Sequence, residues 1–372
     1  MVTLPIFLSA LIGWIAWPHQ LLPLVVTAPA LIMRSPNRVT ATLSAWAYYL
    51  AASSGIPHGA AVFFGPGSTT EGIMLWLGAG AVNALPWAIL WNRHSGLRTR
   101  SALALVILSV PPLGLVGWAS PLTAAGILFP GLGFAGLAFT LWLIVSAIDG
   151  GVMMITALLI ASLANLVYTE PTACHMKAID THFSGVASGS RDYISEYSRN
   201  VTAIALASQS KATITVLPET VAGTWTGATA SLWQPLATSS SGIIAVGAET
   251  LLLRNGYENG VILMSKSGYG FFPQRVPVPV SMWKPWSKDG ARADWFGSGI
   301  ARFDGRKIGY LICYEQLLVW PALITAYNKP DVMLGLANDW WAKDTTIPGI
   351  QRMAIRSWAR LYGWKMVDAG NL

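Results

Sequence analysis

The stretch that decides the fold of the second half of the chain is Lys307-Ile308-Gly309-Tyr310-Leu311-Ile312-Cys313-Tyr314-Glu315-Gln316. Its apolar and aromatic run, Ile308–Cys313, is typical of a buried strand. The polar residues after it mark the point where the strand turns toward a helix. A thiol at such a turn lies near backbone N–H groups and a helix N-terminus, which favour a thiolate and can bind a developing oxyanion. The alternative is a packed core cysteine, since free cysteine is among the most buried residue types.

Charge is distributed unevenly along the chain. The 372 residues are 53% hydrophobic and only 11% charged, whereas about a quarter of the residues of a soluble protein are charged. Of the 24 basic and 17 acidic residues, the part up to Tyr168 holds five arginines and two acids: Arg34, Arg38, Arg93, Arg98, Arg100, Glu71 and Asp149. This pattern predicts a membrane domain followed by a mostly soluble one. The net charge of +7 then suits an anionic membrane surface better than nucleic acid, so no direct nucleic-acid binding is expected.

Seven apolar segments define the expected α-helical transmembrane domain of about seven spans. They are Leu4–Trp17, Leu21–Met33, Val39–Ile56, Thr70–Trp91, Ser101–Ala119, Leu122–Ile148 and Val152–Val167. A span needs about 20 apolar residues, so the third to the sixth fit best. Pro111, Pro112 and Pro130 fall inside spans, where kinks are tolerated. The expected organisation is a transmembrane domain at 1–168, a linker at 169–189 and an α/β domain at 190–372.

The arginines set the expected orientation. Arg34 and Arg38 follow the second segment, and the Arg93–Arg100 loop follows the fourth. Because basic loops stay in the cytoplasm, the N-terminus is predicted to be cytoplasmic. Seven spans would then place everything after Tyr168 on the outer face.

Strands alternate with helices in the second half, which favours an α/β domain with a large sheet. A helix is expected at Ser190–Ser210, and further helices at Leu317–Tyr327 and Ile347–Leu361. Loops are expected at Gly223–Gly227 and Pro235–Gly242. The expected strands are Thr213–Pro218, Gly242–Glu249, Asn259–Ser265, Ile308–Cys313, Asp331–Ala337 and Lys365–Ala369.

Three of these strands end in polar residues. Glu219 follows the strand Thr213–Pro218, Cys313-Tyr314-Glu315 closes the strand quoted first, and Asn338-Asp339-Trp340-Trp341 follows Asp331–Ala337. In open α/β sheets the functional crevice lies beyond the carboxyl ends of the strands. Taken alone, Glu219 would be interpreted as a charged loop residue exposed to solvent. Three such strand ends together predict a catalytic site.

Together these motifs resemble the carbon–nitrogen hydrolase (nitrilase) superfamily. They are Pro218-Glu219-Thr220, Ile312-Cys313-Tyr314-Glu315 and Ala337-Asn338-Asp339-Trp340-Trp341. The membrane-bound branch that includes apolipoprotein N-acyltransferase is most similar, since it also has a multi-span domain before its hydrolase domain. Within that branch the chain looks most like proteins of conjugal plasmid transfer. The resemblance implies a nitrilase-like αββα sandwich and a Glu-Lys-Cys triad.

The resemblance also assigns roles. Glu219 would take the proton from Cys313, and the thiolate would attack an acyl carbon to give a thioester. Glu315 would fall where the acyltransferase branch carries a further acid that orders the site. Tyr314, Trp340 and Asn338 would bind substrate, with ordinary packing as the alternative for the two aromatic residues.

The family lysine has no obvious counterpart. The corresponding segment reads Phe271-Phe272-Pro273-Gln274-Arg275-Val276-Pro277-Val278-Pro279. Matching Pro279 to the family proline puts Gln274 at the lysine, and matching Pro277 puts Phe272 there. Arg275 is the nearest cation and is the expected oxyanion stabiliser, with Lys266 and Lys284 as alternatives.

The sequence therefore predicts a membrane-bound cysteine acyltransferase or amidase at the periplasmic face of the bacterial inner membrane, serving conjugative transfer. The alternative is a catalytically impaired assembly factor that keeps the fold. The expected partners are the lipid bilayer, a lipid or acylated substrate, and pilin or other proteins of the conjugation apparatus. No cofactor is implied. Cys174-His175 is too small a set for a metal site, so no metal is predicted either.

Overall fold

The computed structural model describes residues 3–65, 67–185, 192–253 and 255–372, and these residues form two compact units. A helical unit contains Met1–Pro171, Leu317–Trp320 and Asp344–Trp364. An α/β unit contains Thr172–Gln316, Pro321–Lys343 and Lys365–Leu372. The chain therefore returns to the helical unit after most of the α/β unit is complete.

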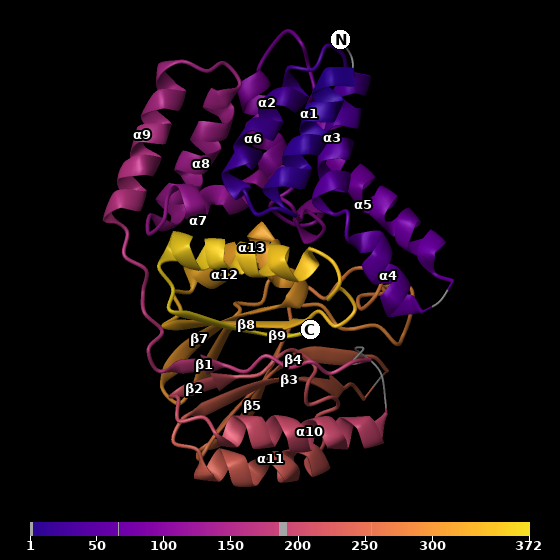
Figure 1. The fold of residues 1–372 in the computed structure, drawn as a ribbon, viewed down its shortest axis with the longest axis vertical. Helices are drawn as coiled ribbons and strands as arrows, with labels where there is room; N and C mark the ends of the chain where they lie inside the picture. Colours follow the sequence, from indigo (N-terminus) through magenta and orange to yellow (C-terminus); the bar gives the residue numbers. More distant parts are fainter. Residues whose placement is uncertain (1–2, 66, 186–191, 254) are drawn as a thin grey trace. The chain divides into compact units, whose positions relative to one another are not determined.

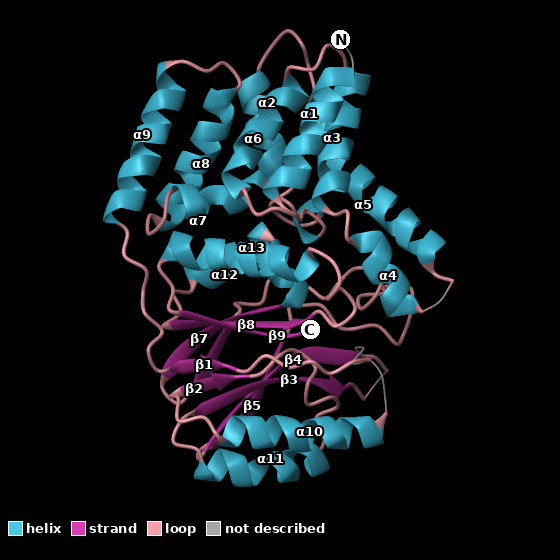
Figure 2. Ribbon diagram, in the orientation of Figure 1, coloured by secondary structure: helices cyan, strands magenta, loops and turns pink. Residues whose placement is uncertain are grey.

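Two sheets form the centre of the α/β unit (Figure 2). The first sheet has the order β1-β2-β3-β4-β5, with parallel pairing from β1 to β3 and antiparallel pairing from β3 to β5. Its strands are β1 (Met176–Ala178), β2 (Ile214–Val216), β3 (Ile243–Leu251), β4 (Tyr257–Ser265) and β5 (Gly268–Pro273). The second sheet has the order β6-β7-β8-β9, antiparallel at β6–β7 and otherwise parallel. Its strands are β6 (Ile300–Phe303), β7 (Arg306–Ile312), β8 (Val332–Asn338) and β9 (Met366–Asn371).

The main core of this unit lies between the two sheets. Val216 and Val261 of the first sheet pack in one buried cluster with Ile308, Ile312 and Leu334 of the second. These side chains alternate with others that face the opposite side of each sheet, as the period of two residues in a strand requires. The core therefore brings the carboxyl ends of β2, β7 and β8 into one layered structure.

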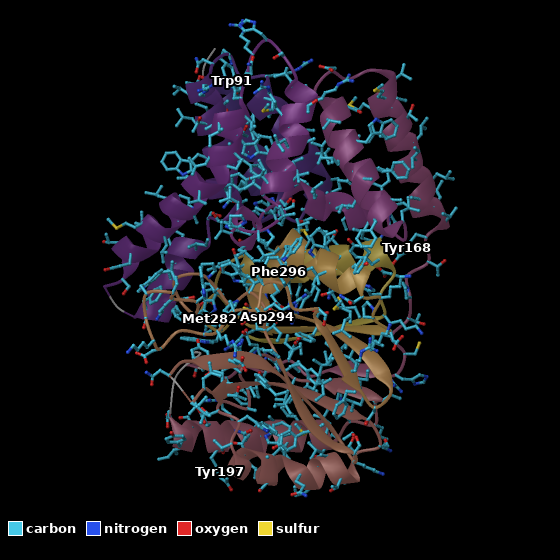
Figure 3. The ribbon with its side chains drawn as sticks, turned by 180° about the vertical axis from the view of Figure 1, so that it is seen from behind. Trp91, Tyr168, Tyr197, Met282, Asp294 and Phe296 are labelled. Atoms are coloured by element: carbon cyan, nitrogen blue, oxygen red, sulfur yellow. The ribbon has the colours of Figure 1, made fainter. Side chains whose placement is uncertain are left out.

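Helices α10 (Tyr193–Ser208) and α11 (Gly227–Ser239) lie side by side on the other face of the first sheet (Figure 1). Ala203 and Ala207 of α10 and Trp233 of α11 pack against β3 and β4 there. The outer side of α10 carries Tyr197, which is 63% exposed and is labelled in Figure 3. Helix α12 (Val319–Tyr327) follows β7, and a long loop carrying Met282, Asp294 and Phe296 joins β5 to β6 (Figure 3).

The helical unit is built mainly from short helices. They are α1 (Thr3–Ala16), α2 (Ala28–Met33), α3 (Arg38–Ala52), α4 (Ile56–Phe64), α5 (Thr69–Leu90), α6 (Leu97–Ile107), α7 (Ala125–Leu128), α8 (Gly133–Ala147), α9 (Val152–Val167) and α13 (Ile347–Tyr362), with 3₁₀ turns at Leu22–Thr27, Leu113–Leu115 and Pro121–Ala124. Helix α13 packs closely on α7: a Cβ on Gly126 would lie 1.7 Å from the Ser357 carbonyl oxygen. The Ser357 hydroxyl also donates a hydrogen bond to the Thr123 carbonyl.

The prediction of about seven transmembrane spans is wrong. Among the described residues, only α5 is by itself long and apolar enough to cross a membrane. The segments Pro121–Leu128 and Gly133–Ala147, which meet at a bend of 120°, would add a second span if they are counted together as one. The other apolar runs fold into helices that are too short, such as the 14 residues of α1 and the 16 of α9. At 1.5 Å per residue these reach about 21–24 Å, whereas the bilayer core is about 30 Å thick. Prolines end helices here: α6 stops at Ile107 before Pro111 and Pro112, and α7 stops before Pro130.

Most strands and helices expected in the second half are confirmed to within a few residues. The start of the helix expected at Ser190 and the end of the expected linker fall on 186–191, outside the described residues, and β1 lies within the part expected as linker. The loop expected at Pro235–Gly242 is wrong in its first part, because α11 continues through Pro235 to Ser239. Burial of Trp233, Leu236 and Ala237 favours the helix despite the proline. Strands β1, β5 and β6 were not expected.

Candidate active site

Glu219 lies in the turn that follows β2. The pairing of β2 with β3 continues past the strand, since Leu217 N donates to the Ala245 carbonyl and Gly247 N donates to the Pro218 carbonyl. The backbone of this turn approaches β3 so closely that a Cβ on Gly247 would lie 2.3 Å from the Glu219 Cα. Only glycine fits there, and the Glu219 side chain is held in the interior with 2% exposure.

Cys313 follows β7 and begins a 3₁₀ turn, Cys313–Leu317. Its φ angle of 48° is in the left-handed region, which non-glycine residues rarely adopt outside functional sites and tight turns. The turn is held by Gln316, whose Nε2 donates to the carbonyls of Leu311 on β7 and Leu336 on β8. The strand-to-helix turn expected from the sequence is therefore confirmed, and Cys313 is 7% exposed.

The Glu219 carboxyl and the Cys313 thiol are hydrogen-bonded to each other. The pKa of Glu219 is raised to about 8, mainly by burial and to a smaller extent by the charges of Asp339 and Glu249, against the lowering effect of the hydrogen bonds from Cys313 and Asn259. Burial and the charges of Glu219 and Asp339 also raise the pKa of the Cys313 thiol well above its usual value. A carboxyl group with a pKa near neutrality beside a thiol is the arrangement that a general base and its nucleophile need.

Two carboxamides are linked to Glu219 by hydrogen bonds, and the first of them, Asn259, was not predicted from the sequence. Asn259 Nδ2 donates to Glu219 Oε1 at 2.6 Å and to Gln274 Oε1 at 2.9 Å. Gln274 Nε2 donates to the carbonyl of Ile312 at 3.1 Å, one residue before Cys313. Gln274 was marked only by the match of Pro279 to the family proline. The signal for Asn259 is its position opposite Gln274 on the neighbouring strand, where its carbonyl accepts a hydrogen bond from Gln274 N.

Arg275 and Glu315 form a separate buried ion pair. Arg275 Nε lies 3.2 Å from Glu315 Oε1, and the two side chains are 2% and 0% exposed. The guanidinium group also donates to Thr325 Oγ1 and to the carbonyls of Pro321 and Tyr310. Glu315 accepts further hydrogen bonds from the backbone N–H groups of Arg275, Val276 and Ile312. The guanidinium group of Arg275 therefore donates to Glu315, to Thr325 and to nearby carbonyls, and none of these hydrogen bonds reaches Glu219 or Cys313.

The other predicted residues lie around the same strand ends. Asn338 is 6% exposed and its side-chain oxygen accepts from Asn371 Nδ2 at 2.9 Å, while its backbone gives Cys313 a hydrogen bond that lowers the thiol pKa. Burial raises the pKa of Tyr314. Tyr314 and Trp340 are both half-buried. Lys266 is exposed, and Lys284 is partly exposed.

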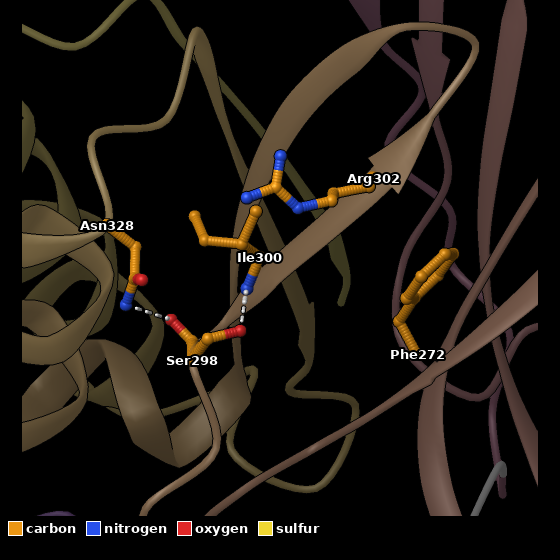
Figure 4. A pocket seen from close by; sticks show the side chains of 5 residues that line it. All are labelled: Phe272, Ser298, Ile300, Arg302 and Asn328. Carbon is orange, nitrogen blue, oxygen red and sulfur yellow. Dashed lines mark hydrogen bonds between the residues drawn. The ribbon is translucent and has the colours of Figure 1, made fainter.

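A pocket of about 360 Å³ is lined by Phe272, Ser298, Ile300, Arg302 and Asn328 (Figure 4). None of the predicted site residues lines it. Among these lining residues, Asn328 Nδ2 donates to the Ser298 carbonyl and Ile300 N donates to the Ser298 hydroxyl (Figure 4). The residues that the structure describes contain no group of three His, Cys, Asp or Glu side chains that could hold a metal ion.

The fold and the site thus define an α/β unit that holds a cysteine and a carboxyl base at neighbouring strand ends. No protein-family model matches the chain. Similar solved structures include a carbon–nitrogen hydrolase from Helicobacter pylori, with 12% identity and a TM-score of 0.40 over 52% of this chain and 72% of that chain. Another is an amidase of the nitrilase superfamily from Nesterenkonia, with 12% identity and a TM-score of 0.41 over 55% of this chain and 79% of that chain.

Curated proteins match over nearly the whole length. The chain is 33% identical over 98% of its residues to a probable conjugal transfer protein TraB of Sinorhizobium fredii, covering 96% of that protein. It is 32% identical over 100% of its residues to the conjugal transfer protein TraB of Agrobacterium fabrum, covering 93% of that protein. The chain belongs to the TraB family of conjugal transfer proteins. The resemblance to proteins of conjugal plasmid transfer is therefore confirmed.

Proposed function

We propose that the chain is a cysteine amidase or acyltransferase that serves conjugal plasmid transfer and acts through a thioester on Cys313. The observation that carries this proposal is the buried, hydrogen-bonded pair of Glu219 and Cys313 at the ends of β2 and β7. A pilin or another protein of the transfer apparatus, or a lipid or acylated molecule, would supply the acyl group.

The proposed reaction has two halves. Cys313 Sγ forms a bond to the acyl carbon while its proton passes to Glu219, and the bond from that carbon to the leaving group breaks as Glu219 returns the proton to it. Water or an amine then attacks the thioester and gives its proton to Glu219, and Glu219 passes that proton to the Cys313 sulfur as the carbon–sulfur bond breaks. Glu219 must be ionised to start each half, so its raised pKa implies a rate that increases as the pH approaches 8.

Intact-mass spectrometry of the protein purified from cells that carry the transfer system tests the thioester. We expect a fraction of the protein to carry an acyl mass on Cys313, removable by neutral hydroxylamine, which cleaves thioesters. Glu219→Gln should change that fraction, since the base serves both halves of the reaction. Cys174→Ala is the matched control, because Cys174 is exposed and lies outside the site. An acyl mass that persists in Cys313→Ala would contradict the proposal.

We also propose that the helical unit associates with the inner membrane and that the α/β unit faces the periplasm. Helix α5 supplies one candidate span. Helix α9 has no charged residue and exposes a series of large apolar side chains, Val152, Ile155, Leu159, Leu163 and Leu166, each at least 55% exposed. Such a surface fits lipid better than water. Asp149 lies 3.7 Å from Arg34 and 2.6 Å from Arg98, so the basic loops meet at one end of this unit, as a cytoplasmic end would require.

Extraction and reporter fusions test this location. The protein is expected to stay in the membrane pellet after alkaline carbonate extraction. A reporter inserted in the Arg93–Arg100 loop should give a cytoplasmic signal, and one inserted at Asp192 a periplasmic signal. Release by carbonate would contradict the membrane association, and equal signals at the two positions would contradict the orientation.

A second candidate is an assembly factor that has kept the fold and lost most of its chemistry. The observation that favours it is that, among the residues described, no Lys or Arg is hydrogen-bonded or ion-paired to Glu219 or Cys313 in the contacts given above. A site without a cation would stabilise an oxyanion less well. Transfer by a Cys313→Ala strain distinguishes the two candidates and is considered in the Discussion.

A further inference from the structure

A chain of hydrogen bonds joins the base of the site to the strand that carries the nucleophile. It runs from Glu219 through Asn259 and Gln274 to the carbonyl of Ile312. Glu219 follows β2 and Asn259 lies on β4 of the first sheet, whereas Ile312 lies on β7 of the second, so this chain crosses the interface between the sheets. All four residues are at most 2% exposed.

The direction of every hydrogen bond in this chain is fixed. A backbone carbonyl can only accept, so Gln274 must turn its Nε2 to Ile312 and its Oε1 to Asn259. Asn259 must then turn its Nδ2 to Gln274, and the second N–H of the same nitrogen goes to Glu219 Oε1. Neither amide can flip without losing a buried hydrogen bond and leaving a buried polar group unsatisfied. The Glu219 carboxyl therefore faces a donor whose orientation is set by the residue before Cys313.

We propose that Asn259 and Gln274 are the positioning residues of this site, and that their two carboxamides take the place of a cation by holding Glu219 in line with Cys313. This proposal rests on the proposed function, because it assigns Glu219 as the base for Cys313. Two matches to the family lysine were possible, and the contacts favour the one that places Gln274 there. Gln274 accepts a hydrogen bond from Asn259, which also donates to Glu219.

A neutral amide and a cation have different electrostatic effects. A neutral donor orients the carboxylate but adds no positive charge, whereas an ammonium group at the same place would stabilise both the carboxylate and the thiolate. The charged groups that face the pair are Asp339 after β8 and Glu249 on β3, both of which raise the pKa of Glu219. The pair therefore lies among acids, with amides as its nearest donors, and it should be most reactive at alkaline pH.

The rate at which Cys313 reacts with iodoacetamide, measured against pH, tests the proposal without any knowledge of the substrate. The experiment uses the full-length protein with Cys174→Ser, because the exposed Cys174 would otherwise react as well. Gln274→Lys is expected to move the midpoint of the profile down by about one pH unit or more and to raise the rate at pH 7 about tenfold. The control is Gln234→Lys, the same change at an exposed position on α11, which should leave the profile where it was.

Gln274→Met removes the chain without adding charge and keeps the side chain about the same size. Its expected result is a slower reaction at every pH, with a midpoint no lower than that of the parent. A purely structural role for Gln274 would change the melting temperature of these variants but leave both the rate and the midpoint of the Cys313 reaction as in the parent. If Gln274→Lys does not fold, Gln274→Met decides the question, and a parental profile for either variant would overturn the proposal.

The outcome is separable from that of the proposed function. If Cys313→Ala supports transfer like the parent, the enzyme proposal fails, whatever the alkylation profiles are. If Cys313 is required but the Gln274 variants keep the parental profile, the enzyme proposal stands and the role given to the two amides fails.

Discussion

Replacing Arg275 with alanine is expected to lower the free energy of unfolding of the α/β unit by about 3–5 kcal/mol, the usual loss when one partner of a buried ion pair is removed. The change would leave the Glu315 carboxylate, which is 0% exposed, without its counter-ion. It would also remove the donors to Thr325 and to the carbonyls of Pro321 and Tyr310. Chemical denaturation followed by the fluorescence of the tryptophans measures the effect.

Matched variants separate this ion pair from ordinary surface charge. Arg302→Ala removes an exposed arginine of the same unit and should change the free energy of unfolding by about 0.5 kcal/mol at most. Arg275→Lys keeps the charge but has fewer donors, so its loss should be intermediate. The sequence assigned Arg275 to catalysis instead. An Arg275→Ala protein that unfolds like the parent but has lost its reactivity would restore that assignment.

The second large effect is expected on plasmid transfer itself. In a strain whose own copy is deleted, Cys313→Ala should reduce the conjugation frequency to the level of the strain without the protein, because no thioester can form. Glu219→Gln should retain some transfer, since loss of a general base costs about 10²–10⁴ in rate. Counting transconjugants per donor cell, with protein levels checked by immunoblot, gives both values.

The controls for this experiment are Cys174→Ala and Glu258→Gln, which make the same chemical changes away from the site. Glu258 pairs with Arg292 near the surface of the same unit. Both strains should transfer plasmid like the parent. Normal transfer by Cys313→Ala, from a strain in which the protein is still required, would favour the assembly factor over the enzyme.

The sequence predicted the α/β unit better than the helical one, and the reason is physical. Strands such as β7 and β8 are continuous apolar runs because both of their faces are buried, so the pattern identifies them directly. In the helical unit the residues on both sides of a helix end are equally apolar, so the sequence does not show where one helix stops and the next begins. Hydropathy cannot tell a 16-residue helix such as α9 from a full span, and it does not reveal that α6 ends four residues before Pro111.

The site shows a similar division. Glu219 and Cys313 follow from short motifs at strand ends, where side chains leave the sheet at a predictable place. The role of Gln274 against that of Arg275 could not be predicted in this way. The two residues are adjacent, and which of them turns toward Glu219 depends on how β5 is paired with β4. The sequence pattern did not identify β5 as a strand. The hydrogen bond from Gln274 to Ile312 joins residues 38 positions apart, so the orientation of Gln274 also depends on how the two sheets pack together.

The return of α13 to the helical unit has a consequence for how the chain is made. The ribosome releases α1 to α9 first, yet Gly126 of α7 and the neighbouring Thr123 gain their contacts with Ser357 only when that residue has been synthesised. The second sheet waits longer still, since β9 is its last strand. Neither unit can therefore complete its packing until α13 and β9 have been synthesised.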